Sequence, residues 1–305
     1  MSIPLSGQQY EIRKGEQVAV VVEVGGGVRE YRVADRPVLD PYPWEAMCDG
    51  AHGAVLVPWP NRLGDGRYRF DGVDYQVPIT EPEKGTAIHG LLRWCNWDPV
   101  SQDSNQVTMG IRLCPQPGYP FLLDVTVNYL LDDQGLTVTT TATNRGEHAC
   151  PYGCGHHPYL SPGSGLINQG VLNFTAGTRI VTDPQRQLPT GTEPVTGSFF
   201  DFSTGRQLGD QRIDFAFTDL ARDGDGRAWV RLDGPDGRCA ELWVDGTYPL
   251  IELYTGDTLS PHRRRQGLGV EPMTCPPNAF QSGDRVHRVE PGQTITTRWG
   301  VRLHA

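Results

Sequence analysis

Hydrophobic positions along the chain fall in short runs rather than in helical stripes. Gly, Pro and Asp separate these runs roughly every eight to twelve residues, and few windows show a 3.6-residue period. Short apolar runs at this spacing are typical of all-β sandwiches and barrels. In the first half of the chain we expect strands over 17–24, 28–33, 106–113, 122–131 and 136–144.

The second half of the chain repeats this pattern. We expect strands over 171–175, 179–182, 212–220, 228–232, 240–244, 249–256, 267–274 and 293–303, whereas 187–195 is rich in turn residues. Residues 67–70 and 73–77 flank Asp71-Gly72, a dipeptide that favours the tight turn of a β-hairpin. No low-complexity linker or shift in composition divides the chain, so we expect a single domain over residues 1–305.

Charge and composition exclude several classes of partner. The net charge of −9 argues against nucleic acid and anionic membrane surfaces, which require a basic protein surface. No apolar run approaches membrane-spanning length, and the N-terminus lacks the pattern of a signal peptide. Seven cysteines without framework spacing favour reduced thiols. We therefore expect a cytoplasmic monomer or homodimer.

Two adjacent histidines, His156 and His157, are the most conspicuous chemical feature. In an extended segment their side chains point to opposite faces, so one can face a cleft while the other packs. An imidazole with a pKa near ~6.5 is well suited to carry a proton at neutral pH. Two alternatives remain open: a purely structural histidine, or a metal site with Cys150 and Cys154, whose spacing lacks the second ligand pair of typical zinc sites.

A glutamate near the C-terminal end of the chain is the natural partner for such a histidine. Glu271 stands between Val270 and Pro272, and a carboxylate in an apolar setting needs a hydrogen-bond donor or a chemical task. An ion pair with the arginine run 263–265 is the alternative, although that run reads more naturally as a solvated loop. A carboxylate base and an imidazole acid in one cleft would suit proton transfer between two oxygens of a small substrate.

Several short motifs, in this order, make the chain resemble the aldose 1-epimerase (mutarotase) family over almost its whole length. They are Asn61-Arg62, Gly66-x-Tyr68-x-Phe70-x-Gly72, Ile88-His89-Gly90, Gly155-x-His157-Pro158-Tyr159-Leu160, Leu188-Pro189-Thr190-Gly191, Ile213-Asp214, Val270-Glu271-Pro272-Met273-Thr274 and Asn278-Ala279-Phe280.

The resemblance implies a β-supersandwich of the galactose mutarotase type that interconverts the α and β anomers of a hexose without metal or cofactor. By position, Glu271 would be the general base and His157 the general acid that protonates the ring oxygen. Arg62 and His89 would bind the ring oxygen or hydroxyls, with Asn61 and Asp214 on other sugar oxygens. Because both reacting oxygens are attached to one carbon, we expect the functional atoms of Glu271 and His157 within about 4–8 Å.

Two other functions stay open on the sequence. A hexose-6-phosphate 1-epimerase would use the same acid and base with added cationic groups, and Arg93 and Trp94 stand close enough to His89 to flank such a site. A non-catalytic sugar-binding protein of the same fold would need no matched acid and base, so the presence of both Glu271 and His157 favours an enzyme.

Overall fold

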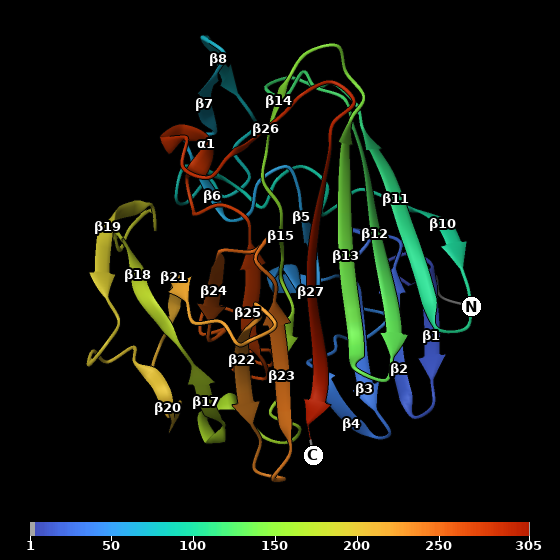
Figure 1. The fold of residues 1–305 in the computed structure, drawn as a ribbon, viewed down its shortest axis with the longest axis vertical. Helices are drawn as coiled ribbons and strands as arrows, with labels where there is room; N and C mark the ends of the chain where they lie inside the picture. Colours follow the sequence, from blue (N-terminus) through green and yellow to red (C-terminus); the bar gives the residue numbers. More distant parts are fainter. Residues whose placement is uncertain (1–3, 305) are drawn as a thin grey trace.

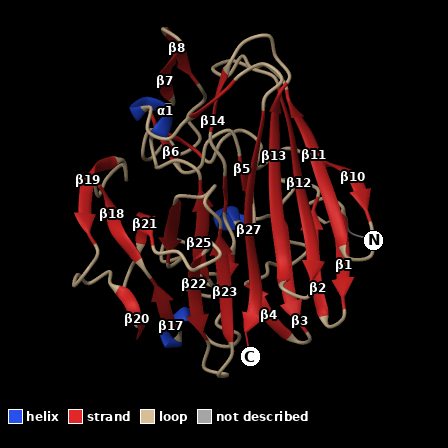
Figure 2. Ribbon diagram, viewed as in Figure 1, coloured by secondary structure: helices blue, strands red, loops and turns tan. Residues whose placement is uncertain are grey.

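A computed structural model describes residues 4–304 and is built almost entirely from antiparallel strands (Figures 1 and 2). Its only α-helix in that range is the single turn α1 (Ala279–Ser282), and two 3-10 turns cover Asp49–Ala51 and Ile167–Gln169. No helix among the described residues has the length and apolarity that a membrane crossing requires. The predicted all-β class is confirmed.

Two large sheets form the body of the molecule. The first has twelve strands, ordered β1 (Gln9–Lys14), β2 (Gln17–Val22), β3 (Val28–Val33), β4 (Arg36–Leu39), β16 (Tyr159–Leu160), β25 (Leu268–Met273), β24 (Leu250–Tyr254), β21 (Asp214–Leu220), β18 (Ala176–Thr182) and β19 (Pro189–Pro194), with β15 (Gly155–His156) and β5 (Val55–Leu56) joined to its middle.

The second sheet lies in front of the first in Figure 1. Its nine strands are ordered β10 (Asp98–Gln102), β11 (Gln106–Leu113), β12 (Leu123–Asp132), β13 (Gly135–Asn144), β27 (Thr294–His304), β23 (Cys239–Val244), β22 (Ala228–Asp233), β17 (Val171–Phe174) and β20 (Phe202–Gln207). Three small ribbons complete the described fold: β6 (Arg62–Gly64) with β9 (Thr86–Ile88), β7 (Arg67–Phe70) with β8 (Val73–Gln76), and β14 (Cys150–Tyr152) with β26 (His287–Val289).

The core lies between the two large sheets because their strands alternate in burial. In β12, every second residue from Leu123 to Leu131 is fully buried, while the residues between them are partly exposed. These side chains share one continuous apolar cluster with residues of the first sheet such as Val21, Ile251 and Val270. Each fully buried side chain of this size stabilises the fold by roughly 1.5–3 kcal/mol. The two sheets packed over this core form a β-supersandwich.

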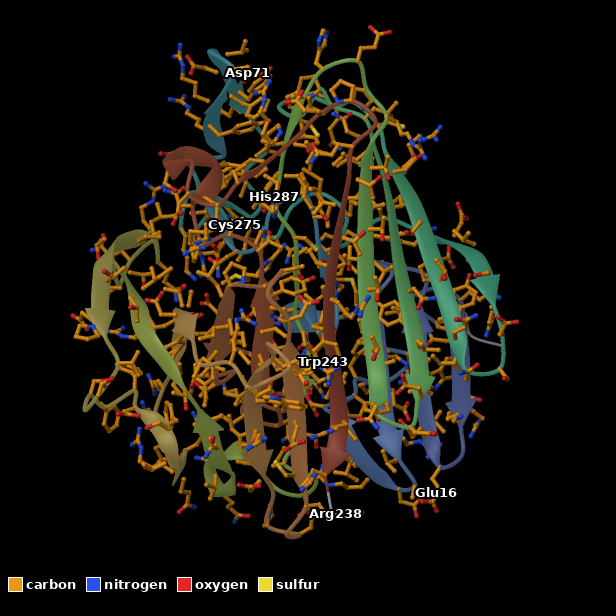
Figure 3. All side chains as sticks on the ribbon, viewed as in Figure 1. Glu16, Asp71, Arg238, Trp243, Cys275 and His287 are labelled. Carbon is orange, nitrogen blue, oxygen red and sulfur yellow. The ribbon has the colours of Figure 1, made fainter. Side chains whose placement is uncertain are left out.

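Most predicted strands match observed ones to within a few residues, and β11 matches at both ends. The Asp71-Gly72 hairpin is confirmed: both residues have positive φ, and Figure 3 shows Asp71 at the tip of β7–β8. The turn-rich reading of 187–195 was wrong. Pro189–Pro194 forms β19 at the edge of the first sheet, where a proline without an N–H is tolerated.

Candidate active site

Segments distant in sequence meet at a cavity of about 600 Å³ beside the first sheet. All six predicted site residues line it: Asn61, Arg62, His89, His157, Asp214 and Glu271. Asp214 begins β21 and Glu271 lies within β25, two strands that both pair with β24. His157 directly follows β15, which pairs with β25 through Gly155 and Met273. Sheet pairing therefore places the acidic groups and the histidine beside one another.

The cavity wall opposite the sheet depends on two residues with unusual backbones. Asn61 and His89 both have positive φ, a conformation that non-glycine residues rarely adopt. They hold one another: the Asn61 N–H donates to Nδ1 of His89 at 3.2 Å, and the His89 N–H donates to the Asn61 carbonyl at 2.9 Å. Next to them Gly90 is required, because a Cβ there would lie 2.1 Å from the Val57 carbonyl oxygen.

The catalytic pair predicted from the sequence is in direct contact. Nε2 of His157 lies 3.1 Å from Oε1 of Glu271, closer than the expected 4–8 Å, and both side chains are almost fully buried. The His157 ring stacks on Tyr159, with ring centroids 5.0 Å apart, and meets the His89 ring edge-on at 5.3 Å. Packing on two sides fixes the imidazole plane, so its position relative to Glu271 is set before any substrate arrives.

Burial shifts both members of this pair away from their ordinary protonation. Desolvation lowers the pKa of His157 to about 3. Desolvation, followed by the nearby carboxyl groups of Glu252 and Asp214, raises the pKa of Glu271 well above its usual range. Burial therefore opposes the charged form of each group, and the 3.1 Å contact joins the two by a hydrogen bond. Burial thus moves His157 away from the ordinary imidazole pKa near ~6.5.

Arg62 and Asp214 are held by a connected polar network. The Arg62 guanidinium donates to both oxygens of Glu81, at 2.8 and 3.1 Å. Lys84 pairs with the same carboxylate at 3.0 Å and also donates to Gln187, whose amide donates to Asp214. Hydrogen bonds with Glu81 and Gln187 thus orient Arg62 and Asp214, two of the groups predicted to contact sugar oxygens. The sequence motifs did not identify these two supporting side chains.

Sequence reasoning missed a second buried glutamate. Glu252 is the register partner of Glu271 across β24 and β25, and it is only 3% exposed. The signal was available: Glu252 is a single charged residue within the apolar run Leu250–Leu253, the same kind of anomaly that singled out Glu271.

The arginine run 263–265 does not pair with Glu271, and it is solvated only in part: Arg264 is exposed, whereas its two neighbours form ion pairs. Arg263 pairs with Asp40 at 2.9 Å, and Arg265 pairs with Asp257 at 3.0 Å. Both side chains are 11% exposed, so these ion pairs pin the loop to its surroundings. Arg93 and Trp94, by contrast, line the cavity as the sequence suggested.

Metal binding has two possible donor sets, and neither fits. Cys150, Cys154, His156 and His157 do not assemble, because His156 turns to the opposite face and its Nε2 bonds the Thr140 hydroxyl at 2.7 Å. Donor atoms of His89, His157 and Glu271 do lie within 4.8 Å of one another. A metal-bound histidine normally donates its other ring N–H, but Nδ1 of His89 accepts from Asn61, so its proton occupies Nε2.

Comparisons with known proteins identify relatives of this chain in sequence and in fold. A family model described as aldose 1-epimerase matches residues 8–302. The chain is 34% identical to the uncharacterized Escherichia coli K12 protein YihR, over 94% of this chain and 91% of that protein. It is 27% identical to the aldose 1-epimerase of the same organism, over 73% and 71% respectively. A solved structure, a putative aldose 1-epimerase from Escherichia coli K12, superposes with a TM-score of 0.83 at 22% identity, over 97% of this chain and 99% of that chain.

Proposed function

Since the chain belongs to the aldose 1-epimerase family, we propose that it is a cofactor-independent isomerase that interconverts the α and β anomers of a hexose. The observation that carries this proposal is the contact between Nε2 of His157 and Oε1 of Glu271 inside a polar cavity. A proton donor and a proton acceptor in contact can serve two oxygens that share one carbon.

In the proposed ring opening the sugar gives one proton to Glu271 and receives one from His157. The Glu271 carboxylate takes the proton of the anomeric hydroxyl, a C1=O double bond forms, and the bond between C1 and the ring oxygen breaks. The His157 imidazolium gives its proton to the departing ring oxygen. After rotation about C1–C2, His157 takes this proton back, the oxygen attacks the other face of C1, and Glu271 returns its proton to O1.

Burial of the pair favours the ring-opening step. With cyclic sugar the reacting pair is ionic, Glu271 carboxylate and His157 imidazolium, whereas with open-chain aldehyde both groups are neutral. The pKa directions in this site, His157 lowered and Glu271 raised by desolvation, favour the neutral state. Once the ionic pair has formed, proton transfer to and from the sugar therefore runs toward the neutral pair and the open-chain intermediate.

The surrounding groups are suited to sugar hydroxyls. His89 presents a fixed Nε2–H donor, because its Nδ1 accepts from Asn61 and burial keeps the pKa of the ring well below its usual range. Arg62 supplies further donors, and Asp214 supplies acceptors. Such a mixture of fixed donors and acceptors matches hydroxyl groups, which both donate and accept.

Polarimetry of freshly dissolved α-glucose and α-galactose tests the proposal. We expect the rate of mutarotation of at least one sugar to rise in proportion to protein concentration above the spontaneous rate. If neither rate changes while calorimetry shows that sugar binds in the cavity, the chain is a sugar-binding protein of this fold. If neither turnover nor binding is found, the hexose assignment itself fails.

A second candidate, a hexose-6-phosphate 1-epimerase, is favoured by Arg93. This side chain lines the cavity and has no carboxylate or hydrogen-bond partner among residues 4–304; its guanidinium instead lies 5.2 Å from the centre of the Trp94 ring. A cation without a counter-charge in a substrate cavity is suited to an anionic substituent.

The two candidates separate by substrate. If the substrate is phosphorylated, Arg93→Met should lower kcat/KM for glucose 6-phosphate by roughly 10-fold or more, the scale of a hydrogen bond to a charged group, and leave kcat/KM for glucose unchanged. Arg145→Met is the control, since Arg145 is exposed and pairs with Asp124 of β12, outside the cavity. Equal effects of Arg93→Met on both sugars would remove the phosphorylated candidate.

A further inference from the structure

Two glutamates face each other beside the cavity, an arrangement that ionised carboxylates do not tolerate. Glu252 and Glu271 are direct partners in the β24–β25 register, so their side chains lie on the same face of the sheet. Both are buried, at 3% and 2% exposure. Like charges directly opposite one another are destabilising even at an exposed position, and burial makes the repulsion larger.

The cations nearby do not resolve this repulsion. Arg62 and Lys84 are both engaged by Glu81. Among residues 4–304, none of the carboxyl groups of Asp214, Glu252 and Glu271 forms an ion pair with a lysine or arginine. The three carboxyl groups must therefore share at least one proton.

Contacts around Glu252 indicate where this proton is held. Asp214 lies on the same face of β21, two residues from Ala216, the register partner of Glu252, so the two carboxyl groups are diagonal neighbours. A hydrogen bond between two carboxyl groups requires that one of them carry a proton. Asp214 is partly exposed and already accepts a hydrogen bond from the Gln187 amide. Oε2 is buried without a partner in both Glu252 and Glu271, but Oε1 of Glu271 contacts His157, so Glu252 is the better site for a retained proton.

Glu252 is also set apart from Glu271 by its access to the substrate. Glu271 lines the cavity and contacts His157, whereas Glu252 does not line the cavity. On its other side Glu252 pairs with Ala216 of β21, a small apolar residue that adds no charge. The titratable and charged groups that face it are thus Glu271 from β25, Asp214 from β21 and Arg62 from β6.

We propose that Glu252 is a positioning residue that holds the resident proton of the site as a neutral carboxylic acid. Its O–H donates to Asp214 and fixes that carboxylate toward the sugar. Its neutrality leaves Glu271 as the one member of the glutamate pair that gains and loses a proton. The kinetic part of this inference rests on the proposed epimerase activity, whereas the protonation state does not. Burial and the adjacent Asp214 also raise the pKa of Glu252 well above its usual range, in agreement with the geometry.

Infrared spectroscopy tests the protonation state without any assay. At pH 7 the protein should show absorption of protonated carboxyl groups that shifts in D2O, and Glu252→Gln should remove one such component. Glu241→Gln is the matched control, because Glu241 is equally buried but forms ion pairs with Arg231 and Arg302. The control variant should keep every protonated band. If Glu252→Gln removes no protonated band, the proposal is overturned.

Kinetics test the positioning role. The amide of Glu252→Gln still donates to Asp214, so we expect kcat/KM within about threefold of wild type and an unchanged acid limb of the pH profile. Glu252→Leu removes the donor and should lower kcat/KM about tenfold or more. If Glu252 were ionised, Glu252→Gln would shift the acid limb to lower pH by about one unit or more. That shift, or equal activity of the Gln and Leu variants, would contradict the proposal.

These experiments can distinguish a failure of the proton assignment from a failure of the proposed epimerase activity. The wild-type protein could fail to epimerise any hexose while Glu252→Gln still removes one protonated band. That result would contradict the proposed activity and support the assignment of the proton to Glu252. If Glu252→Leu fails to fold, as judged by urea unfolding, the Gln variant still decides the question through its infrared spectrum and pH profile.

Discussion

The two faces of strands β24 and β25 carry opposite chemistry on the same backbone. On one face Ile251, Leu253 and Val270 join the apolar core between the sheets. On the other face Glu252 and Glu271 meet beside the cavity. The difference arises only from the two-residue alternation of a strand, so a register slip of one residue would exchange core and site. The chemistry of this site therefore depends on the register that the core enforces.

His156 and His157 repeat this comparison within one dipeptide. His156 turns into the core, where its Nε2 bonds Thr140 and its ring lies 5.4 Å from that of Trp299. His157 turns to the cavity and contacts Glu271. Burial lowers the pKa of each to about 3. A shifted pKa thus does not distinguish a structural histidine from a reactive one, whereas the partner does.

The largest effect that we expect is from changes on the cavity face of β25. Glu271→Gln should reduce kcat at least ~10²-fold, because the amide cannot accept the anomeric proton. Stability should not fall, since a neutral amide replaces a carboxyl group whose ionisation burial opposes. Anomer-exchange kinetics and urea unfolding measure the two quantities. Near-normal turnover by a folded variant would show that Glu271 is not the base.

His157→Asn should cause a loss of similar size, at least ~10²-fold in kcat, because an asparagine amide cannot give a proton to the ring oxygen and take it back. His287→Asn is the matched control. His287 is also partly buried with a lowered pKa, but it packs beside Tyr152 outside the cavity. We expect the control to retain wild-type turnover in the same assay. Comparable losses in both variants would point to a general effect of histidine removal.

A change on the core face should have a smaller effect, and on stability instead of turnover. His156→Leu removes the bond to Thr140 and should lower the free energy of unfolding by about 1–2 kcal/mol at pH 7.5, with kcat preserved. The unfolded chain binds a proton on this histidine below pH 6.5, whereas the folded protein does so only near pH 3. The stability of the wild-type protein therefore decreases as the pH is lowered through this window.

His156→Leu lacks this cost, so its deficit should shrink or reverse at pH 5. Urea unfolding followed by tryptophan fluorescence at both pH values measures the difference, in which the contributions of His89 and His157 cancel. A deficit that stays constant between the two pH values would show that His156 is not buried in its neutral form.

Removal of metal ions should have no effect on turnover. Dialysis against a strong chelator should leave mutarotation unchanged, because the tautomer of His89 is unsuited to metal binding and the two cysteines lie away from His157. Metal analysis before and after dialysis accompanies the assay. Stoichiometric zinc whose removal abolishes turnover would contradict this expectation.

Local sequence was sufficient for the strand pattern, the Asp71-Gly72 turn and the opposed directions of His156 and His157, because alternation and turn chemistry are short-range properties. Polar positions inside apolar or turn-rich sequence were also sufficient to single out five of the six cavity residues, whereas Asp214 was identified only through the family resemblance. It failed for 187–195, where pairing with β18 overrides turn composition.

Only the tertiary structure decided which of these groups touch and how they are protonated. The 3.1 Å contact of His157 with Glu271 joins positions more than one hundred residues apart, and it follows from the pairing of β15 with β25. The placement of Glu252 behind Glu271 follows from the β24–β25 register. Desolvation then moves the pKa values of these groups far from their values in an unfolded chain, because the cost of burying charge depends on every surrounding atom.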